Sequence, residues 1–139
     1  MAVEPRYLID NSALMRYRHP PIAETLDALL SRGLIGVSIV TELEAGYSAR
    51  SAADYDNMQG FLREMLPVQV TPRAEQRARV IQERLVHADQ HRAVSVADIL
   101  LAATAHEEGL IVLHYDGDFD FISQITGQPT EWGVPRGSV

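Results

Sequence analysis

Short apolar runs alternate with longer amphipathic segments along the chain. The runs at 6–10, 34–39, 67–70 and 110–113 have the length of buried strands, and 130–134 resembles an edge strand. Segments with helical spacing or helix boundary signals lie at 11–18, 22–31, 41–49, 51–65, 72–90, 95–108 and 119–125. Strands that alternate with helices are typical of a parallel sheet covered on both faces. We therefore expect a single α/β domain spanning residues 1–139.

Carboxylates follow the predicted strands at the edge where such sheets bind ligands. Asp10 comes directly after the first strand, and Asp116 and Asp118 follow the apolar run at 110–113. In open parallel sheets, ligands bind at the carboxyl ends of the strands, where the strand order reverses. Each acid has a structural alternative, since Asp10 can cap a helix and Asp116-Gly117 is typical of a turn. Ser12 is a supporting candidate that could cap a helix or hydrogen-bond a metal-bound water.

Asp98 is the only charged residue between positions 96 and 105, in an otherwise apolar helical segment. It occupies the third position of a helix that Ser95 could cap, where a negative charge suits the helix dipole. This role is compatible with metal binding, because a helix start can hold a carboxylate in place for an ion.

Glu42 and Glu44 compete for a further acidic position. At about 100° per residue, Val40, Leu43 and Tyr47 define an apolar stripe. Glu44 lies at the edge of this stripe, whereas Glu42 lies about 160° from Glu44 and faces solvent. Glu44 is therefore the better ligand candidate, with a capping box from Thr41 to Glu44 as the alternative.

The composition excludes several kinds of chemistry. The chain has no cysteine, which rules out thiol nucleophiles and Cys-ligated zinc, and all twelve basic residues are arginine. Without lysine, P-loop nucleotide binding and Schiff-base chemistry are excluded. No apolar run approaches the ~20 residues of a membrane span, and the start of the chain lacks the core of a secretory signal. We expect a cytoplasmic protein with no membrane partner.

Taken together, the acids predict a site for a divalent cation. The formal net charge is −7, so the chain is no general nucleic-acid coat, but the acids could gather around a cation. Carboxylates a few ångströms apart cannot all stay ionised without a counter-charge. Oxygen ligands favour Mg²⁺, with Mn²⁺ as a possible substitute. The expected ligands are Asp10, Glu44, Asp98, Asp116 and, as a helper, Asp118.

Four motifs resemble those of the PIN-domain ribonucleases and, among these, the VapC toxins of bacterial toxin–antitoxin pairs. YLIDNSAL at 7–14 resembles the opening strand of the family, and the acid at Glu44 sits in a spacing similar to the second motif. The segment 98–105, DILLAATA, is the most specific match, and HYDGDF at 114–119 resembles the last motif. His114 stands where many members of the family have Thr.

The resemblance implies a three-layer α/β/α fold with a central parallel sheet of four or five strands. It also implies a metal-dependent endoribonuclease that cleaves RNA phosphodiester bonds with a metal-activated water. The catalytic residues would be Asp10, Glu44, Asp98 and Asp116. The resemblance further implies that the chain forms a homodimer and binds a cognate VapB-type antitoxin.

Two other functions remain open from the sequence. A DNase would use the same acids, and a PIN-like module could bind a partner or nucleic acid without cleavage. Arg73, Arg77 and Arg84 share one helix face and could touch phosphates, although a solvated face is the favoured interpretation. Arg16 and Arg18 lie near the Asp10 edge and are equally open to either role.

Overall fold

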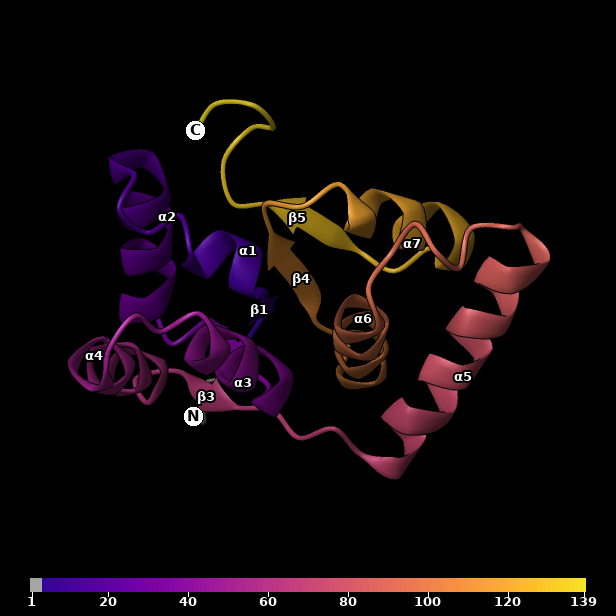
Figure 1. The fold of residues 1–139 in the computed structure, drawn as a ribbon, viewed down its shortest axis with the longest axis horizontal. Coiled ribbons are helices and arrows are strands. Elements are labelled where there is room, and N and C mark those ends of the chain that lie inside the picture. The colour runs from indigo at the N-terminus through magenta and orange to yellow at the C-terminus, as the bar shows by residue number, and fades with distance from the viewer. Residues whose placement is uncertain (1–3) are drawn as a thin grey trace.

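A five-stranded parallel sheet forms the centre of the computed structural model, which describes residues 4–139 (Figure 1). Its strands are β1 (Tyr7–Ile9), β2 (Ile35–Val37), β3 (Leu66–Pro67), β4 (Ile111–His114) and β5 (Thr130–Trp132). Their spatial order is β3-β2-β1-β4-β5, and every neighbouring pair is parallel. The expected parallel α/β sheet is thereby confirmed, with five strands.

Seven helices connect and cover the strands within the described residues. They are α1 (Asn11–Leu14), α2 (Pro20–Ser31), α3 (Ile39–Tyr47), α4 (Ala52–Leu62), α5 (Pro72–His87), α6 (Val96–Glu108) and α7 (Asp118–Thr126). Alternate residues of the central strands enter different cores. Leu8 and Val112 pack with residues of α5, α6 and α7, whereas Ile9 and Leu113 pack with residues of α1, α2 and α4. This alternation makes the fold a three-layer α/β/α arrangement.

The strand order reverses between β1 and β4. From β1 the chain continues to β2 and β3 on one side, then returns to β4 and β5 on the other. β1 and β4 are direct neighbours, with Ile9 paired to Leu113. The residues that follow these two strands therefore lie together at the carboxyl edge, which is where a parallel sheet leaves space for a ligand. These residues include Asp10 and Asp116.

Most predicted elements are present, and the differences have local causes. Helix α2 begins at Pro20 and not at residue 22, because proline suits the first turn, where no amide donor is needed. Ile39 belongs to α3, since Ser38 caps that helix and ends β2 early. The third strand is limited to Leu66–Pro67 and does not continue to Val70.

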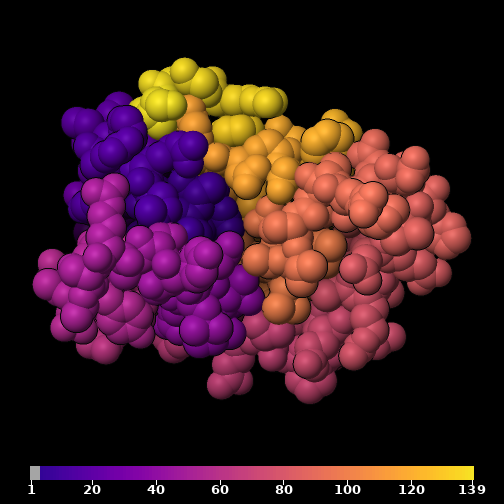
Figure 2. Space-filling model, viewed as in Figure 1, coloured from indigo at the N-terminus to yellow at the C-terminus, as the bar shows by residue number. Residues whose placement is uncertain are grey.

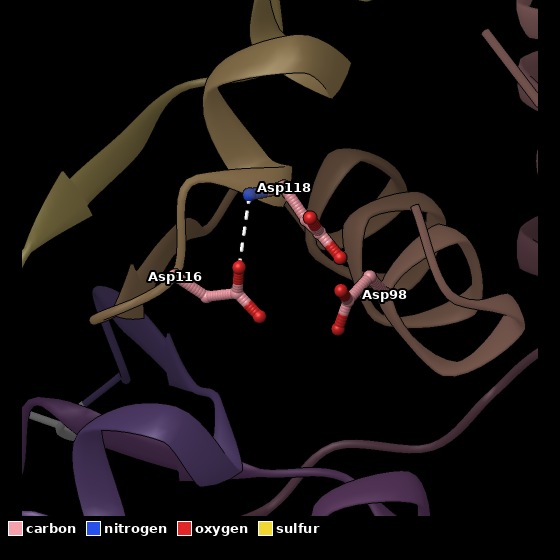
Figure 3. Close-up of side chains that lie close together, drawn as sticks. All are labelled: Asp98, Asp116 and Asp118. Atoms are coloured by element: carbon pink, nitrogen blue, oxygen red, sulfur yellow. Dashed lines mark hydrogen bonds between the residues drawn. The ribbon is translucent and has the colours of Figure 1, made fainter. Parts of the chain in front are cut away.

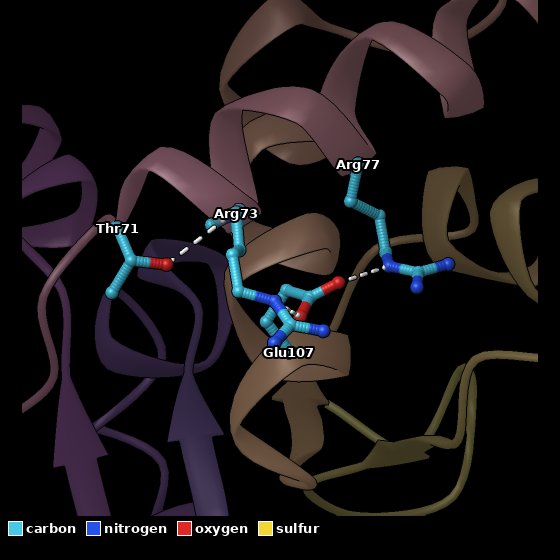
Figure 4. A network of polar contacts seen from close by, with 5 residues as sticks. Thr71, Arg73, Arg77 and Glu107 are labelled. Carbon is cyan, nitrogen blue, oxygen red and sulfur yellow. Dashed lines mark hydrogen bonds and ion pairs between the residues drawn. The ribbon is translucent and has the colours of Figure 1, made fainter.

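An ion-pair network joins α5 to α6 (Figure 4). Arg77 Nε donates to Glu107 Oε1 at 2.6 Å, and Arg73 Nε lies 3.4 Å from Glu107 Oε2. Thr71 caps α5 by accepting from the Ala74 amide. Arg77 thus helps to dock α5 on α6, which favours a structural role for this residue over phosphate binding, while the Arg73 side chain is 87% exposed and remains solvated.

None of the helices within residues 4–139 has the length and apolar character needed to cross a bilayer.

The central strand β2 leaves no room for a side chain at Gly36. A Cβ at this position would lie 2.6 Å from Val68 Cγ2. We expect Gly36→Ala to lower the free energy of unfolding by about 1–3 kcal/mol, because the side chain of Val68, which follows β3, must shift. Gly60→Ala is the matched control, since its Cβ would meet nothing within 4 Å. Within a helix it should be neutral or stabilising by about 0.5–1 kcal/mol. Equal effects of the two substitutions in urea titrations would contradict this packing.

Candidate metal centre

Asp10 is held at the end of β1 by the start of α1. It is the N-cap of α1 and accepts from the Ser12 amide at 2.9 Å, which confirms the capping alternative without removing Asp10 from the site. The Ser12 hydroxyl accepts from the Tyr115 amide at 2.8 Å. This bond ties the loop after β1 to the loop after β4. Ser12 therefore positions both loops.

The loop between β4 and α7 carries two more acids. Asp116 Oδ1 accepts from the Asp118 amide at 2.9 Å, so the Asp116 side chain also caps the first turn of α7 (Figure 3). The Asp116 amide in turn donates to Nδ1 of His114 at 3.1 Å. The Asp116 side chain and the backbone that carries Asp118 are therefore fixed by hydrogen bonds within the loop itself.

Asp98 enters the same space from the first turn of α6. Ser95 caps this helix and accepts from the Asp98 amide at 3.1 Å. The carboxylate is only 5% exposed, although it lies at a helix start. Carboxylate oxygens of Asp98, Asp116 and Asp118 all lie within 4.8 Å of one another (Figure 3). We call these three residues together with Asp10 and Glu44 the acidic cluster.

Glu44 reaches the acidic cluster from α3, but not for the reason that the sequence pattern suggested. The predicted apolar stripe is wrong as a core face, since Leu43 is 67% and Tyr47 is 93% exposed, while Thr41 and Ala45 are buried. Small residues let α3 approach the sheet closely, and the Thr41 hydroxyl donates to the Ile9 carbonyl at 2.8 Å. The helix then presents Glu44 on the flank of its buried side.

The contacts support neither Glu42 as the ligand in place of Glu44 nor a capping box from Thr41 to Glu44. Ser38 caps α3, so Thr41 is not the cap of a box that ends at Glu44. Glu42 lies beside Pro67 and Gln69, near the end of β3 at the edge of the sheet. Glu44 Oε1, by contrast, is buried and has no hydrogen-bond partner among the described residues. A buried carboxylate oxygen without a partner is costly, which indicates a ligand that it can bind.

The charges of neighbouring carboxylates raise the pKa values of Asp10, Glu44 and Asp98. Burial raises the pKa of Asp10. Hydrogen bonds from Ser12 oppose this increase, and the charge of Asp116 adds to it. Burial also raises the pKa of Glu44, with further increases from Asp10 and Asp116. The pKa of Asp98 rises to about 8, first through burial and then through a hydrogen bond with Asp118 and the charges of Asp10 and Asp116. Within residues 4–139, the charged groups behind these three shifts are all carboxylates.

This donor set fits a hard divalent cation. It consists of carboxylate oxygens, it includes the unpartnered oxygen of Glu44, and it lacks a nearby basic group that shifts these pKa values. Mg²⁺ and Mn²⁺ prefer such oxygen ligands. A bound cation would lower the pKa of each acid and let the cluster stay ionised at neutral pH.

His114 is a part of the site whose role was missed in the sequence. It is fully buried, and its ring packs against Phe119 and Trp132 at centroid distances of 4.9 and 5.0 Å. Burial lowers its pKa to about 4, so the ring is neutral and Nδ1 can accept from the Asp116 amide. The sequence shows His114 only as a departure from Thr, because its contacts depend on how the aromatic residues fold around it.

The structure brings every predicted acid toward one place. Asp98, Asp116 and Asp118 are the closest group, and Asp10 and Glu44 lie within electrostatic reach of it. Asp120 is partly exposed at the start of α7 and faces Arg136.

The fold and this site define a class of acidic-cluster α/β proteins, and comparisons with known proteins identify the family. Residues 7–124 match the PIN domain model. Ribonuclease VapC51 of Mycobacterium tuberculosis (strain ATCC 25618 / H37Rv) is 37% identical over 134 residues, covering 96% of this chain and 97% of the relative. Ribonuclease VapC21 of the same strain is 41% identical, with the same two coverages. The chain therefore belongs to the PIN domain family and, within it, to the VapC ribonucleases.

Solved structures of toxin–antitoxin proteins share the fold. The DNA-bound VapBC structure from Salmonella typhimurium contains a chain with a TM-score of 0.77 and 18% identity, covering 94% of this chain and all of that one. VapBC-5 from Mycobacterium tuberculosis gives a TM-score of 0.60 at 20% identity, with 92% and 98% of the two chains covered. These likenesses confirm the three-layer fold.

The raised pKa of Asp98 predicts how the metal-free protein responds to pH. The ordinary pKa is 3.8 and the folded value is about 8, so the stability associated with protonated Asp98 is present below pH 3.8 and is lost as the pH rises toward 8. Asn resembles a protonated Asp, and Asp98→Asn should therefore match the wild-type melting temperature near pH 4 and exceed it progressively up to pH 8.

Thermal melts in a chelator, from pH 4 to pH 8, measure this difference. Asp56→Asn on α4 is the control, because Asp56 is exposed and the substitution also removes one negative charge. A constant difference between wild type and Asp98→Asn across this pH range would contradict the electrostatic strain.

Proposed function

We propose that this protein is a Mg²⁺-dependent endoribonuclease that acts as the toxin of a toxin–antitoxin pair. The convergence of Asp10, Glu44, Asp98, Asp116 and Asp118 at the strand-order reversal carries this proposal. Membership in the VapC ribonucleases supports RNA as the substrate. With an RNA substrate, we expect the protein to act in the cytoplasm.

Asp10, Asp98 and Asp116 would hold the divalent ion, with Glu44 and Asp118 completing its surroundings directly or through water. Mn²⁺ would serve in place of Mg²⁺, since both accept oxygen ligands. When bound, the ion supplies charge stabilisation for the phosphate and makes a water molecule more acidic.

The residues of the chain perform the remaining tasks. Glu44 Oε1 has no hydrogen-bond partner among the described residues, so Glu44 is suited to accept the proton of the attacking water. The water oxygen forms a bond to phosphorus opposite the leaving ribose oxygen, and the bond from phosphorus to that oxygen breaks. His114 and Ser12 hold the two loops that carry Asp116 and Asp10, so the geometry is fixed before the substrate arrives.

Two alternatives make different demands on the same acids. A DNase would need the same cluster, and parallel digestion of RNA and DNA separates it from the proposed activity. A module that binds without cleavage has no need for an unpartnered oxygen on Glu44 or for a buried Asp98 whose pKa is raised to about 8, and this fold bears the cost of both. That cost favours the enzyme.

Substitutions in the acidic cluster test the activity. Asp98→Asn should lower RNA cleavage in Mg²⁺ by at least roughly 100-fold, since it removes a proposed ligand from a folded site. Glu44→Gln should lower it by about 10- to 100-fold. Glu42→Gln is the matched control on the same helix and should leave the rate unchanged. Initial rates on a defined RNA, with metal titrated, measure all three variants.

Retention of wild-type cleavage by Asp98→Asn would overturn the assignment of the site. Equal losses of RNA cleavage in Glu44→Gln and Glu42→Gln would show that Glu44 has no specific role in the site. Cleavage of DNA at the rate of RNA would replace the ribonuclease with a general nuclease.

A VapB-type antitoxin and a second copy of this chain are the proposed partners. Two exposed apolar surfaces support protein–protein assembly. On α3, Ile39, Leu43 and Tyr47 form a stripe at four-residue intervals that points away from the core. Between α1 and α4 lies a groove of about 310 Å³ lined mainly by apolar residues, including Leu14, Met58 and Phe61. Exposed apolar patches of this kind mark interaction sites.

The stripe on α3 can be tested without damage to the fold. Leu43 is exposed, so Leu43→Ser should leave the melting temperature of the isolated chain nearly unchanged. We expect it to weaken self-association or antitoxin binding by tenfold or more, as measured by sedimentation velocity and calorimetry. Val86→Ser is the control, since Val86 is an exposed apolar residue on α5. Unchanged assembly in Leu43→Ser would remove α3 from the interface.

A further inference from the structure

Two arginines lie against aromatic rings beside the acidic cluster. The Arg16 guanidinium lies 4.4 Å from the centroid of the Tyr115 ring, and its Nη1 donates to the Ser12 carbonyl at 2.9 Å. The Arg136 guanidinium lies 5.4 Å from the centroid of the Trp132 ring. Both positive groups therefore lie against rings, and Arg16 is held by a backbone carbonyl as well, although the two arginines come from opposite ends of the chain.

The two rings also contact each other. Tyr115 and Trp132 meet edge to face, with centroids 5.1 Å apart and planes at 87°. Arg16, Tyr115, Trp132 and Arg136 thus form a continuous row, which we call the arginine–aromatic stack. Tyr115 is buried, whereas Arg16 is half-buried and Arg136 is exposed, so both guanidinium groups lie on the side of this row that solvent reaches.

The stack brackets Asp116 along the chain. Arg16 lies over Tyr115, the residue just before Asp116. Arg136 Nη2 lies 3.6 Å from the position that a Cβ on Gly117 would take, and Gly117 is the residue just after Asp116. In the space-filling view, the indigo N-terminal segment and the orange segment that contains the β4–α7 loop meet on one face, with the yellow C-terminal segment beside them (Figure 2).

These arginines do not neutralise the acidic cluster. The charged groups that raise the pKa of Asp10, Glu44 and Asp98 are carboxylates, with no arginine among them. Within residues 4–139, Arg16 has no carboxylate within 4.0 Å, and Arg136 approaches Asp120 only at 3.8 Å in a solvent-exposed pair. Such exposed pairs contribute little, so donors of both guanidiniums are available to another anion.

We propose that Arg16 and Arg136 form a phosphate clamp that binds the RNA backbone on either side of the phosphate placed at Asp116. This inference rests on the proposed ribonuclease function and names the residues that bring its substrate to the site. A planar guanidinium can donate two parallel hydrogen bonds to one phosphate, and stacking on a ring limits its freedom before binding. The faces of the rings are used by the arginines, which favours contact with phosphates over stacking with bases.

The clamp would offset the repulsion between RNA and this negatively charged chain. The chain carries a formal net charge of −7 and contains no lysine, so its overall field repels RNA. Local positive charge at the cleavage site is therefore needed, and Arg73 and Arg77 lie beside Glu107, at the opposite end of α6 from Asp98. Arg16, over Tyr115, and Arg136, near Gly117, would supply this charge on the two sides of Asp116 in the loop.

The salt dependence of RNA binding tests the clamp separately from cleavage. Asp98→Asn serves as the background in a chelator, so that RNA stays intact while a labelled single strand is titrated by fluorescence anisotropy. Each phosphate contact contributes about −0.7 to the slope of log K against log salt concentration. Arg16→Gln and Arg136→Gln should each flatten the slope by about 0.7, and the double variant by about 1.4. Arg79→Gln on the exposed face of α5 is the charge-matched control and should leave the slope unchanged.

The outcomes separate this inference from the function on which it rests. An unchanged slope in the double variant would overturn the clamp, even if the wild type cleaves RNA. Reduced cleavage with an unchanged slope would also overturn it, because the arginines would then only hold the Asp116 loop. A wild type that binds RNA through both arginines but fails to cleave it with Mg²⁺ or Mn²⁺ would refute the ribonuclease and leave the phosphate contacts standing.

Discussion

The mutual repulsion of carboxylates that the fold forces together is the interaction on which the rest of this structure depends. Five acids from four separate segments share one region, and burial adds to the cost of their charges. A fold with only marginal net stability can keep such a group only if other contacts fix it. The cost is relieved when an acid such as Asp98, whose pKa is raised, takes up a proton, or when the cluster binds a cation. Protonation would weaken Asp98 as a metal ligand, whereas a bound cation would let all the acids stay ionised.

The contacts that hold the acids in place are short and lie between different elements. The Thr41 hydroxyl fixes α3 to the end of β1, and the Ser12 hydroxyl fixes the loop after β1 to the loop after β4. His114 remains neutral because it is buried, and this leaves its Nδ1 free to accept from the Asp116 amide. None of these three residues needs to touch a substrate. They act by restricting where Asp10, Glu44 and Asp116 can move.

The sequence predicted the sheet and the acids well, because each leaves a local pattern. Buried strands followed by Asp10 and Asp116, and the isolated charge of Asp98 in an apolar helix, are visible without coordinates. The orientation of α3 was not, since its stripe of large apolar residues faces outward and its small residues face the core. Helical spacing identifies an apolar face, but not whether the core or a partner covers it. The arginine–aromatic stack was also hidden, because Arg16 and Arg136 are far apart along the chain and meet only through the contact of Tyr115 with Trp132.

The central claim is that the acidic cluster binds one or more divalent ions through Asp10, Asp98 and Asp116. Crystals of the full chain soaked in Mn²⁺ and measured at the manganese absorption edge test it most directly, because the anomalous signal locates the ion without any assumption about activity. Our account predicts a strong peak within bonding distance of carboxylate oxygens from these three residues. A peak bound elsewhere, or none at the cluster under conditions in which calorimetry detects Mn²⁺ binding, would contradict it.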